Sequence, residues 1–232
     1  MTIKNQTFIA SVISSAVFIA PAVSASDWYT GLEVGGGKHS SSFSSNVEVD
    51  KDDPVKEAAG KLDSANYLRI NLGRYITDNV RVYGYAQSGS KSEVSYIETD
   101  FETTDKTKFE KNDYQFGVGS DYLYQFNDDW SFVAGGNLGY YNSSLDFKFS
   151  QKDDEGNSAS LKKSSTNRGA VAGLNAGFGY NLTEDWTIET GLKYSMFNDN
   201  EHKLKFDDEE NSQLKYKYKD ATQYYLNASY RF

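Results

Sequence analysis

The chain has 232 residues, a net charge of −9, 15% aromatic residues, 2 prolines and no cysteine. Without cysteine, disulfides and thiolate metal sites are excluded, and an acidic chain with no separate basic cluster gives no support for nucleic-acid binding. Few prolines and many tyrosines and phenylalanines favour an extensive β-sheet over a helical or loop-rich fold.

Residues 1–25 have the pattern of a secretory signal peptide. Lys4 gives a positive start, residues 8–20 are mostly apolar or small, and Val23-Ser24-Ala25 fits the small-x-small cleavage pattern. Serines and Pro21 interrupt the apolar run, which is too broken for a membrane anchor of roughly 20 apolar residues. We therefore expect export through the periplasm, cleavage after Ala25, and one domain of residues 26–232.

Eight later segments alternate apolar and polar residues, as strands with one apolar face do. They begin near Trp28, Leu68, Val80, Tyr114, Phe132, Ala170, Trp186 and Gln223. A transmembrane strand needs only about 9–11 residues, and half of them face the lumen, so a mean hydropathy of −0.67 is compatible with a membrane barrel. The sequence predicts an all-β fold, an eight-stranded antiparallel transmembrane up-and-down β-barrel.

The connections between these strands alternate between short and long. Residues 74–82, 124–132 and 180–188 are similar short hairpins with polar turn residues. Four long polar segments lie near residues 38–64, 88–112, 144–168 and 198–219. Short periplasmic turns and four long extracellular loops are typical of outer-membrane barrels. A soluble β-sandwich or lipocalin-like barrel, the alternative, does not predict this sorting.

The two faces of the strands suggest two groups of functional residues. Outward aromatic residues at the short-turn ends predict a periplasmic girdle of Trp28, Tyr124, Phe126, Trp130, Tyr180 and Trp186. Charges on the opposite faces predict a lumen network of Glu33, Arg69, Arg81, Asp121, Glu189, Lys193 and Arg231. Because buried charges need partners and eight strands leave little space inside, we expect this network to fill the lumen. The alternative is a switchable pair of charges that gates a narrow ion path.

Five segments carry a further pattern: Asn127-Asp-Asp-Trp130, Thr183-Glu-Asp-Trp186, the glycine-rich residues 169–179, residues 189–194, and Tyr230-Arg-Phe232. With these segments the chain resembles the small eight-stranded outer-membrane barrels of Gram-negative bacteria, the OmpA-like and OmpX/Ail-like group. The resemblance is a diffuse pattern over the mature chain, with longer loops than the smallest members and without a periplasmic peptidoglycan-binding domain. It implies an outer-membrane location, and it implies that Tyr230 and Phe232 are the signal read by the barrel assembly machinery.

The expected role is structural and surface-interactive: envelope integrity, adhesion, or contact with a host or the environment through the extracellular loops. A narrow porin-like ion or small-solute channel is the alternative. Expected partners are outer-membrane lipids and lipopolysaccharide, the assembly machinery and a surface ligand. We expect a monomer without a cofactor. We do not expect an enzyme, because His39 and His202 fall in predicted loops and His39-Ser40 carries no lipid-hydrolase signature.

The long polar segments contain two further patterns. Acidic runs at residues 52–53, 153–155 and 207–210 have no EF-hand spacing, and we interpret them as solvated loop tips. The alternative is that they bind divalent cations against lipopolysaccharide phosphates. Alternating lysines and apolar residues at 203–206 and 214–219 predict strands that protrude beyond the membrane. Such strands either extend the barrel wall or offer an edge to a partner strand.

Overall fold

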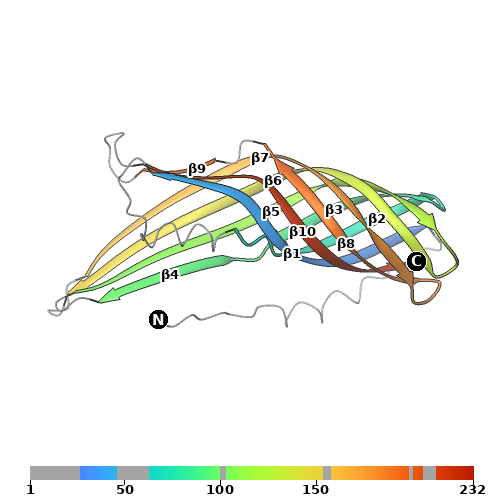
Figure 1. Cartoon of the computed structure of the whole chain (residues 1–232), viewed down its shortest axis with the longest axis horizontal. Helices are drawn as coiled ribbons and strands as arrows, with labels where there is room; N and C mark the ends of the chain where they lie inside the picture. Colours follow the sequence, from blue (N-terminus) through green and yellow to red (C-terminus); the bar gives the residue numbers. More distant parts are fainter. Residues whose placement is uncertain (1–26, 46–62, 100–102, 154–157, 199–200, 206–212) are drawn as a thin grey trace.

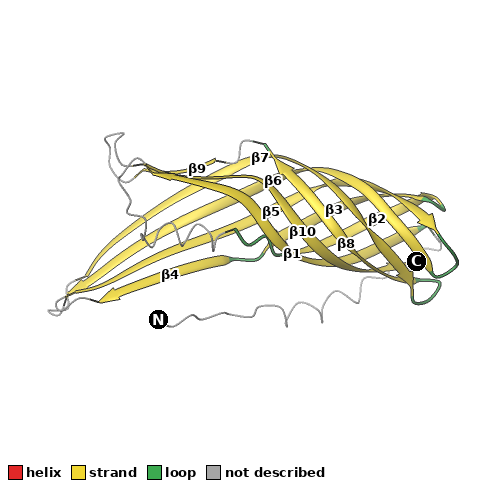
Figure 2. Cartoon of the chain, in the orientation of Figure 1, coloured by secondary structure: helices red, strands yellow, loops and turns green. Residues whose placement is uncertain are grey.

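The structure is a computed structural model that describes residues 27–45, 63–99, 103–153, 158–198, 201–205 and 213–232. The predicted signal peptide, its cleavage site and the acidic runs at 52–53 and 207–210 lie outside the described residues. Figure 2 shows that the described residues form strands joined by turns. Within these ranges, no helix is long and apolar enough to cross a membrane.

Ten strands make up the described part of the chain (Figure 1). They are β1 (Trp28–Ser45), β2 (Tyr67–Thr77), β3 (Val80–Gly89), β4 (Ser92–Thr99), β5 (Thr103–Gln125), β6 (Trp130–Asp153), β7 (Ser158–Asn181), β8 (Trp186–Phe197), β9 (Glu201–Lys205) and β10 (Gln213–Arg231). Eight of them pair in the order β1-β2-β3-β5-β6-β7-β8-β10, and β10 pairs antiparallel with β1 to close the ring. The predicted eight-stranded antiparallel barrel is confirmed.

The strands continue much further than the alternation at the membrane level predicts. β5 has 23 residues and β6 and β7 have 24 each, and the short strands β4 and β9 add to their ends. Much of the four segments expected as loops is therefore strand. The protruding strands predicted at 214–219 and, for its described part, at 203–206 are confirmed by β10 and β9. The other outer parts were expected as loops because most of their residues are polar, as they are on the water-facing side of a sheet.

The barrel wall exposes a broad band of large apolar side chains. Val118, Leu138 and Tyr224 are each about two-thirds exposed. The neighbouring inward positions on the same strands are occupied by polar residues and glycine, because successive side chains of a strand point to opposite faces. A band of this size on the outside of a closed sheet is the surface that a bilayer covers.

Beyond this band, opposite to the short turns, the strands form a distal extension. It consists of the described residues within 38–64, 89–113, 141–169 and 197–221. Here the single sheet of the barrel divides into two parts, which we call the two sheets of the extension: β4-β5-β6-β7 and β9-β10-β1 (Figure 1). They separate because the β1–β2 pairing ends at Gly35 and the β7–β8 pairing ends at Val171. Side chains from both sheets share one apolar core of Val94, Phe109, Leu145, Phe147, Leu204, Tyr216 and Tyr218. The distal extension is therefore folded around its own core.

Candidate functional site: the charged lumen and its distal cap

The alternation of the strands brings six of the seven charges predicted for the lumen into the interior. Glu33, Arg69, Arg81, Asp121, Glu189 and Lys193 are each at most 6% exposed. They come from β1, β2, β3, β5 and β8, and each occupies an inward position between outward apolar residues. Three are acidic and three are basic, so the buried charges balance.

Arg81 lies at the centre of this network. Its Nε and Nη2 donate to Asp121 Oδ2 at 2.9 and 2.8 Å, and its Nη1 and Nη2 donate to the two oxygens of Glu189 at 2.5 and 2.8 Å. The planar guanidinium has five N–H donors in a fixed geometry, which lets it bind two carboxylates at once. One cation thus holds together two acids that are separated by 68 positions in the sequence.

Lys193 and Glu33 form the second buried ion pair. Lys193 Nζ contacts Glu33 Oε1 and donates to Tyr67 Oη at 3.1 Å, while Tyr67 Oη donates to Glu33 Oε1 at 2.6 Å. A buried ion pair needs such additional hydrogen bonds, because desolvation of both charges otherwise exceeds their attraction. Tyr67 supplies them here.

Arg69 is held by neutral groups on the neighbouring strand β3. Its Nε donates to Gln87 Oε1 at 3.0 Å, and its guanidinium carbon lies 3.8 Å from the ring centroid of Tyr85. Stacking of a guanidinium on an aromatic face is a favourable cation–π contact, and it is strongest where water is excluded. Tyr85 and Gln87 thereby fix an arginine that faces the lumen.

The network leaves little free space. The cavity that it lines has a volume of about 20 Å³, enough for about one water molecule. Glycines on the wall allow this density: a Cβ at Gly119 would lie 2.6 Å from the Tyr83 hydroxyl, and one at Gly135 would lie 2.6 Å from the Ser120 carbonyl. Inward side chains therefore pack directly against the backbone of the wall.

Arg231 is in a different place from the one predicted. Its side chain is 38% exposed at the turn end of the barrel, 3.6 Å from Asp27 and with its guanidinium carbon 4.7 Å from the Tyr75 ring centroid. The alternation correctly puts Arg231 on the inward face of β10. The barrel ends there, however, so the guanidinium lies at the rim and outside the buried six-charge network.

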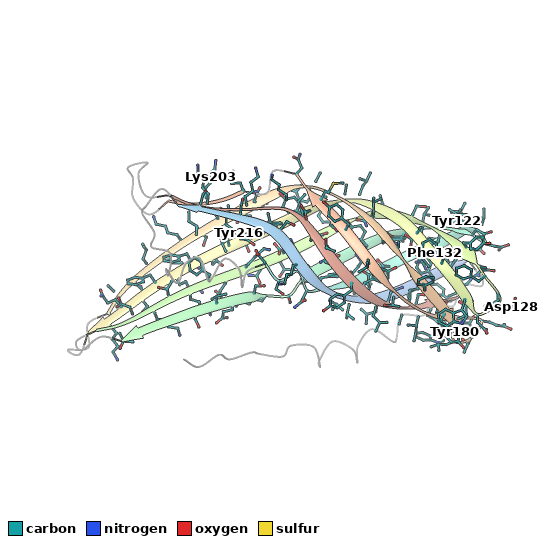
Figure 3. All side chains as sticks on the ribbon, in the orientation of Figure 1. Tyr122, Asp128, Phe132, Tyr180, Lys203 and Tyr216 are labelled. Carbon is teal, nitrogen blue, oxygen red and sulfur yellow. The ribbon has the colours of Figure 1, made fainter. Side chains whose placement is uncertain are left out.

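The predicted girdle residues lie on the outer surface at the short-turn end. Trp28, Tyr124, Phe126, Trp130, Tyr180 and Trp186 are between 38% and 56% exposed. Neighbouring rings contact one another across strands, as Trp130 does with Tyr180 at 4.9 Å and Trp186 with Tyr230 at 5.1 Å between centroids. Figure 3 places Tyr180 beside Asp128 in the turn that precedes Trp130. Tyr230 continues the line of rings to Phe232, at 6.4 Å.

Both histidines are buried in strands, contrary to the expectation that they lie in loops. His39 on β1 is 8% exposed and His202 on β9 is not exposed at all. Burial lowers the pKa of His39 to about 3 and that of His202 to about 4, in each case mainly through desolvation. Ser40 faces away from His39 and donates to Asp220 Oδ1 at 2.7 Å, so the two do not form a catalytic pair.

A serine lies beside the second histidine. Ser143 Oγ is 3.0 Å from His202 Nε2, and neither residue is exposed. A nucleophile needs access to its substrate, and the apolar core of the distal extension covers this pair. The contact is a packing interaction of the interior in this conformation.

The neutral members of the lumen network are absent from the predicted set of residues. Tyr67, Gln87, Asn175 and Tyr83 all bind a buried charge, as when Asn175 Nδ2 donates to Asp121 Oδ1 at 3.2 Å. Their inward position in the alternating pattern was the available signal. The predicted set contains only the charged residues of the inward face. It lacks the neutral hydrogen-bonding partners that buried charges require.

Comparisons with known proteins agree with this architecture. The family model described as "Outer membrane protein beta-barrel domain" matches residues 10–232. No curated protein matches the sequence.

Two solved structures have a similar fold. OprG from Pseudomonas aeruginosa is 12% identical, with 90% of this chain and 96% of that chain covered and a TM-score of 0.51. Neisserial surface protein A is 14% identical, with 88% and 97% covered and a TM-score of 0.50. The closed ring of eight strands, the exposed apolar band and the match over nearly the whole sequence lead to one conclusion: this chain belongs to the family of outer membrane protein β-barrel domains.

Proposed function

We propose that this protein is an outer-membrane barrel with a structural and surface-interactive role, which displays a folded β-extension to the outside of the cell. The observation that carries the proposal is the pairing of a filled lumen with a distal extension that has its own core. A barrel made for transport keeps its interior open. A barrel that binds partners at the cell surface does so through its extracellular end, and in this protein that end carries a folded extension with its own core.

The distal extension is suited to contact because its shape is fixed from within. Its outer face carries a cluster of ion pairs: Glu110, which is only 5% exposed, accepts from Lys148 at 2.8 Å and lies 3.1 Å from Lys108. These lysines and a third, Lys91, lower the pKa of Glu110 to about 2. A stiff charged surface loses little conformational entropy when a partner binds to it.

Shortened hairpins test attachment directly. Replacing residues 150–160 with a two-residue Asn-Gly turn shortens the β6–β7 hairpin and leaves Phe147 and the distal core in place, because the paired residues Phe149 and Leu161 then flank a turn of the favoured length. Cells that display this variant should lose adhesion to matrix or host protein relative to the full chain. The control is a variant altered in the turn at residues 127–129, at the opposite end of the barrel. Equal adhesion by all three would count against the proposal.

Lipopolysaccharide is the lipid partner that we propose for this barrel. Outward cations lie just beyond the apolar band, where Lys38 pairs with Thr222 and Arg168 with Asn142 across neighbouring strands. Both side chains are exposed. Phosphates of a lipid headgroup at this level would meet them.

Biogenesis gives a separate test of the outer-membrane proposal. Phe232 donates its backbone N–H to Trp28 at 2.9 Å and stacks near Tyr230, so it completes the last strand against the first. Deleting Phe232 should reduce the fraction of chain that reaches the outer membrane as folded, heat-modifiable barrel. Phe132→Leu, which keeps an outward apolar side chain near the same end, is the control. Equal folded fractions for the deletion and the full chain would oppose the role of this terminus as an assembly signal.

A narrow ion or small-solute channel is the second candidate. One observation favours it: Arg81 binds two carboxylates, so it is able to release one while it keeps the other. Planar-bilayer recording and liposome swelling separate the two candidates. Large steady conductance or solute flux through the refolded chain would favour the channel, and its absence together with hairpin-dependent adhesion would favour the contact role.

A further inference from the structure

The two buried histidines lie at the seam between the two sheets of the distal extension. His39 comes from β1 and His202 from β9, whereas Lys111 and Asp113 come from β5 and Ser143 from β6. In the described residues, no strand pairing joins β9 to β7, so side chains hold the two sheets together there. We call His39, His202, Lys111, Asp113, Ser143 and Tyr218 the seam cluster.

The seam cluster contains one compensated pair of charges and no further carboxylate that could stabilise a new cation. Lys111 is 1% exposed, with its Nζ 3.2 Å from Asp113 Oδ2 and 4.3 Å from the Tyr218 ring centroid. Tyr218 Oη donates to the other carboxylate oxygen of Asp113 at 3.4 Å. Asp113 is therefore already matched by a lysine and a hydroxyl.

Burial and the neighbouring lysine favour the neutral form of each histidine and outweigh the Asp113 carboxylate, which favours the protonated form. The His39 ring lies 4.7 Å from the ring of Tyr218 and 5.7 Å from that of Phe197, and His202 lies 6.5 Å from Tyr216. The backbone of Asp220 contacts His39 and that of Ser165 contacts His202; these contacts favour the protonated imidazole, but less strongly than desolvation opposes it. The titratable groups packed against them are Lys111 and Asp113 from β5, and Tyr216 and Tyr218 from β10, with Asp63 bound to the Tyr216 hydroxyl. Ser143 from β6, Phe197 from β8 and the Ser165 backbone from β7 also contact them. On β7, Asn167 Nδ2 donates to the Glu201 carbonyl of β9 at 3.2 Å.

We propose that the seam cluster is an acid-sensitive latch: protonation of His39 and His202 separates β9 and the outer part of β10 from β5 and β6, and opens the distal end of the barrel. Protonation of both histidines would add two positive charges beside Lys111. Three cations would then share the single carboxylate of Asp113. Opening exposes both imidazolium groups to water and relieves that repulsion. The strands at the membrane level stay closed, because their charges lie in a separate, balanced network.

The direction of the pH effect follows from linkage. Burial lowers both histidine pKa values, to about 3 and about 4, from an ordinary value near 6.5, so the open state binds more protons than the closed one. The closed state is fully favoured above about pH 6.5 and loses stability as the pH falls from there towards about 4. The nearby carboxylates do not drive the change, since the pKa values of Glu110 and Asp113 are lowered by their lysine partners and both stay ionised through this window.

Hydrogen exchange of the full chain, refolded into phosphatidylcholine nanodiscs, tests the latch between pH 7.5 and pH 4.5. Once β9 and the outer part of β10 separate from β5 and β6, they lose the packed apolar face that so small a ribbon needs for stability, so their own ladder opens more often. After correction for intrinsic exchange rates, protection at residues 201–205 and 213–218 should therefore fall by about ten-fold or more as the pH is lowered. Protection in β2, β3 and β8 should stay constant. Unchanged protection of the distal residues at pH 4.5 would overturn the proposal.

Two variants give the matched comparison. The double variant His39→Gln and His202→Gln cannot take up these protons and should show distal protection that no longer depends on pH. Lys203→Gln, on the outward face of β9, should keep the full response of the unmodified chain. A double variant that still responds as the unmodified chain does would contradict the latch.

NMR titration of the unmodified chain tests the latch independently, and it can be carried out even if the double variant does not fold. The imidazole carbon shifts of both histidines report their protonation directly. Each should titrate well below pH 6, in step with the loss of distal protection. Ordinary titration near pH 6.5, or titration that is not accompanied by exchange at β9, would also overturn the proposal.

Discussion

The same barrel wall encloses a charged lumen at the membrane level and an apolar core in the distal extension. On β5, Phe116 and Val118 point outward and are 60% and 65% exposed, whereas Phe109 points inward and is 2% exposed. At the membrane level the solvent outside is hydrocarbon, so apolar side chains face out and polar ones face in. In the distal extension the solvent is water, and the arrangement is the ordinary one of a soluble sheet. The change of side along one strand marks where the bilayer ends.

A β-bulge produces this change on β10. Tyr216 and Tyr218 are 1% exposed, although Tyr224 and Leu226 have the same sequence parity and lie outside. The register of β1 against β10 shifts between Ser40 and Ser41, which pair with Asp220 and Tyr218 and leave Lys219 as the extra residue. Because of this one extra residue, the side chains on its two sides along β10 have opposite parity for the same face of the sheet.

The lumen should lose the most stability when its central cation is removed. Arg81→Met leaves Asp121 and Glu189 buried next to each other without a counter-charge, so the free energy of unfolding should fall by about 3–5 kcal/mol. Urea unfolding in lipid bilayers measures this. Arg231→Met at the exposed rim is the matched control and should cost no more than about 1 kcal/mol. Similar losses in the free energy of unfolding for both variants would mean that the buried network stabilises the barrel no more than an exposed ion pair does.

Truncating a side chain in the distal core should destabilise the distal extension and leave the membrane-level strands unchanged. Leu204 is 1% exposed in that core, and Leu204→Ala should destabilise the closed extension by about 2–5 kcal/mol through lost packing and a residual cavity. Limited proteolysis and hydrogen exchange should show the loss in β9 and the outer part of β10. Lys203→Ala on the opposite face of β9 should have little effect. If the membrane-level strands lost protection equally, the two regions would form one cooperative unit.

Charged substitutions should locate the boundary between the two regions. Val118→Arg places a charge on the outward face of the apolar band and should cost about 2–4 kcal/mol if it lies near the bilayer midplane. Ser150→Arg places the same side chain on the outward face of the distal extension, and should change the free energy of unfolding by less than about 0.5 kcal/mol. Equal costs in refolded protein would contradict the assignment of the band to the membrane.

The smallest effect is expected at the rim of the turn end. Arg74 and Asp27 are 3.3 Å apart with side chains 51% and 40% exposed. Arg74→Ala should change the free energy of unfolding by about 0–1 kcal/mol, and any loss should shrink at high salt because exposed pairs are screened. A larger loss, insensitive to salt, would show that this rim belongs with the buried network.

Much of the candidate site could be predicted from the sequence because side-chain direction in a strand is a local property. Glu33, Arg81 and Lys193 were placed in the lumen from alternation alone, and they are there. Their partners could not be predicted in the same way. Arg81 meets Glu189 across 108 positions, and this contact depends on the stagger of strands around the closed ring rather than on any neighbouring residue.

The histidines show where local reasoning fails. His39 and His202 lie in polar segments that predict loops, yet both are buried, because the opposite sheet of the distal extension covers them. Arg231 shows the reverse error: its inward direction was predicted correctly, but only the end of the neighbouring strands decides that it reaches the rim. Burial depends on what packs above a residue, which the sequence around it does not contain.

The sequence by itself determined the closed barrel, its eight strands, the outward aromatic residues and the inward charges, because a period of two residues defines both faces of every strand. Only the tertiary structure decided which charges pair, where apolar residues change sides, and that the polar outer segments fold around a core of their own. These features depend on register and on contact between distant strands. Both are fixed only when the ring closes.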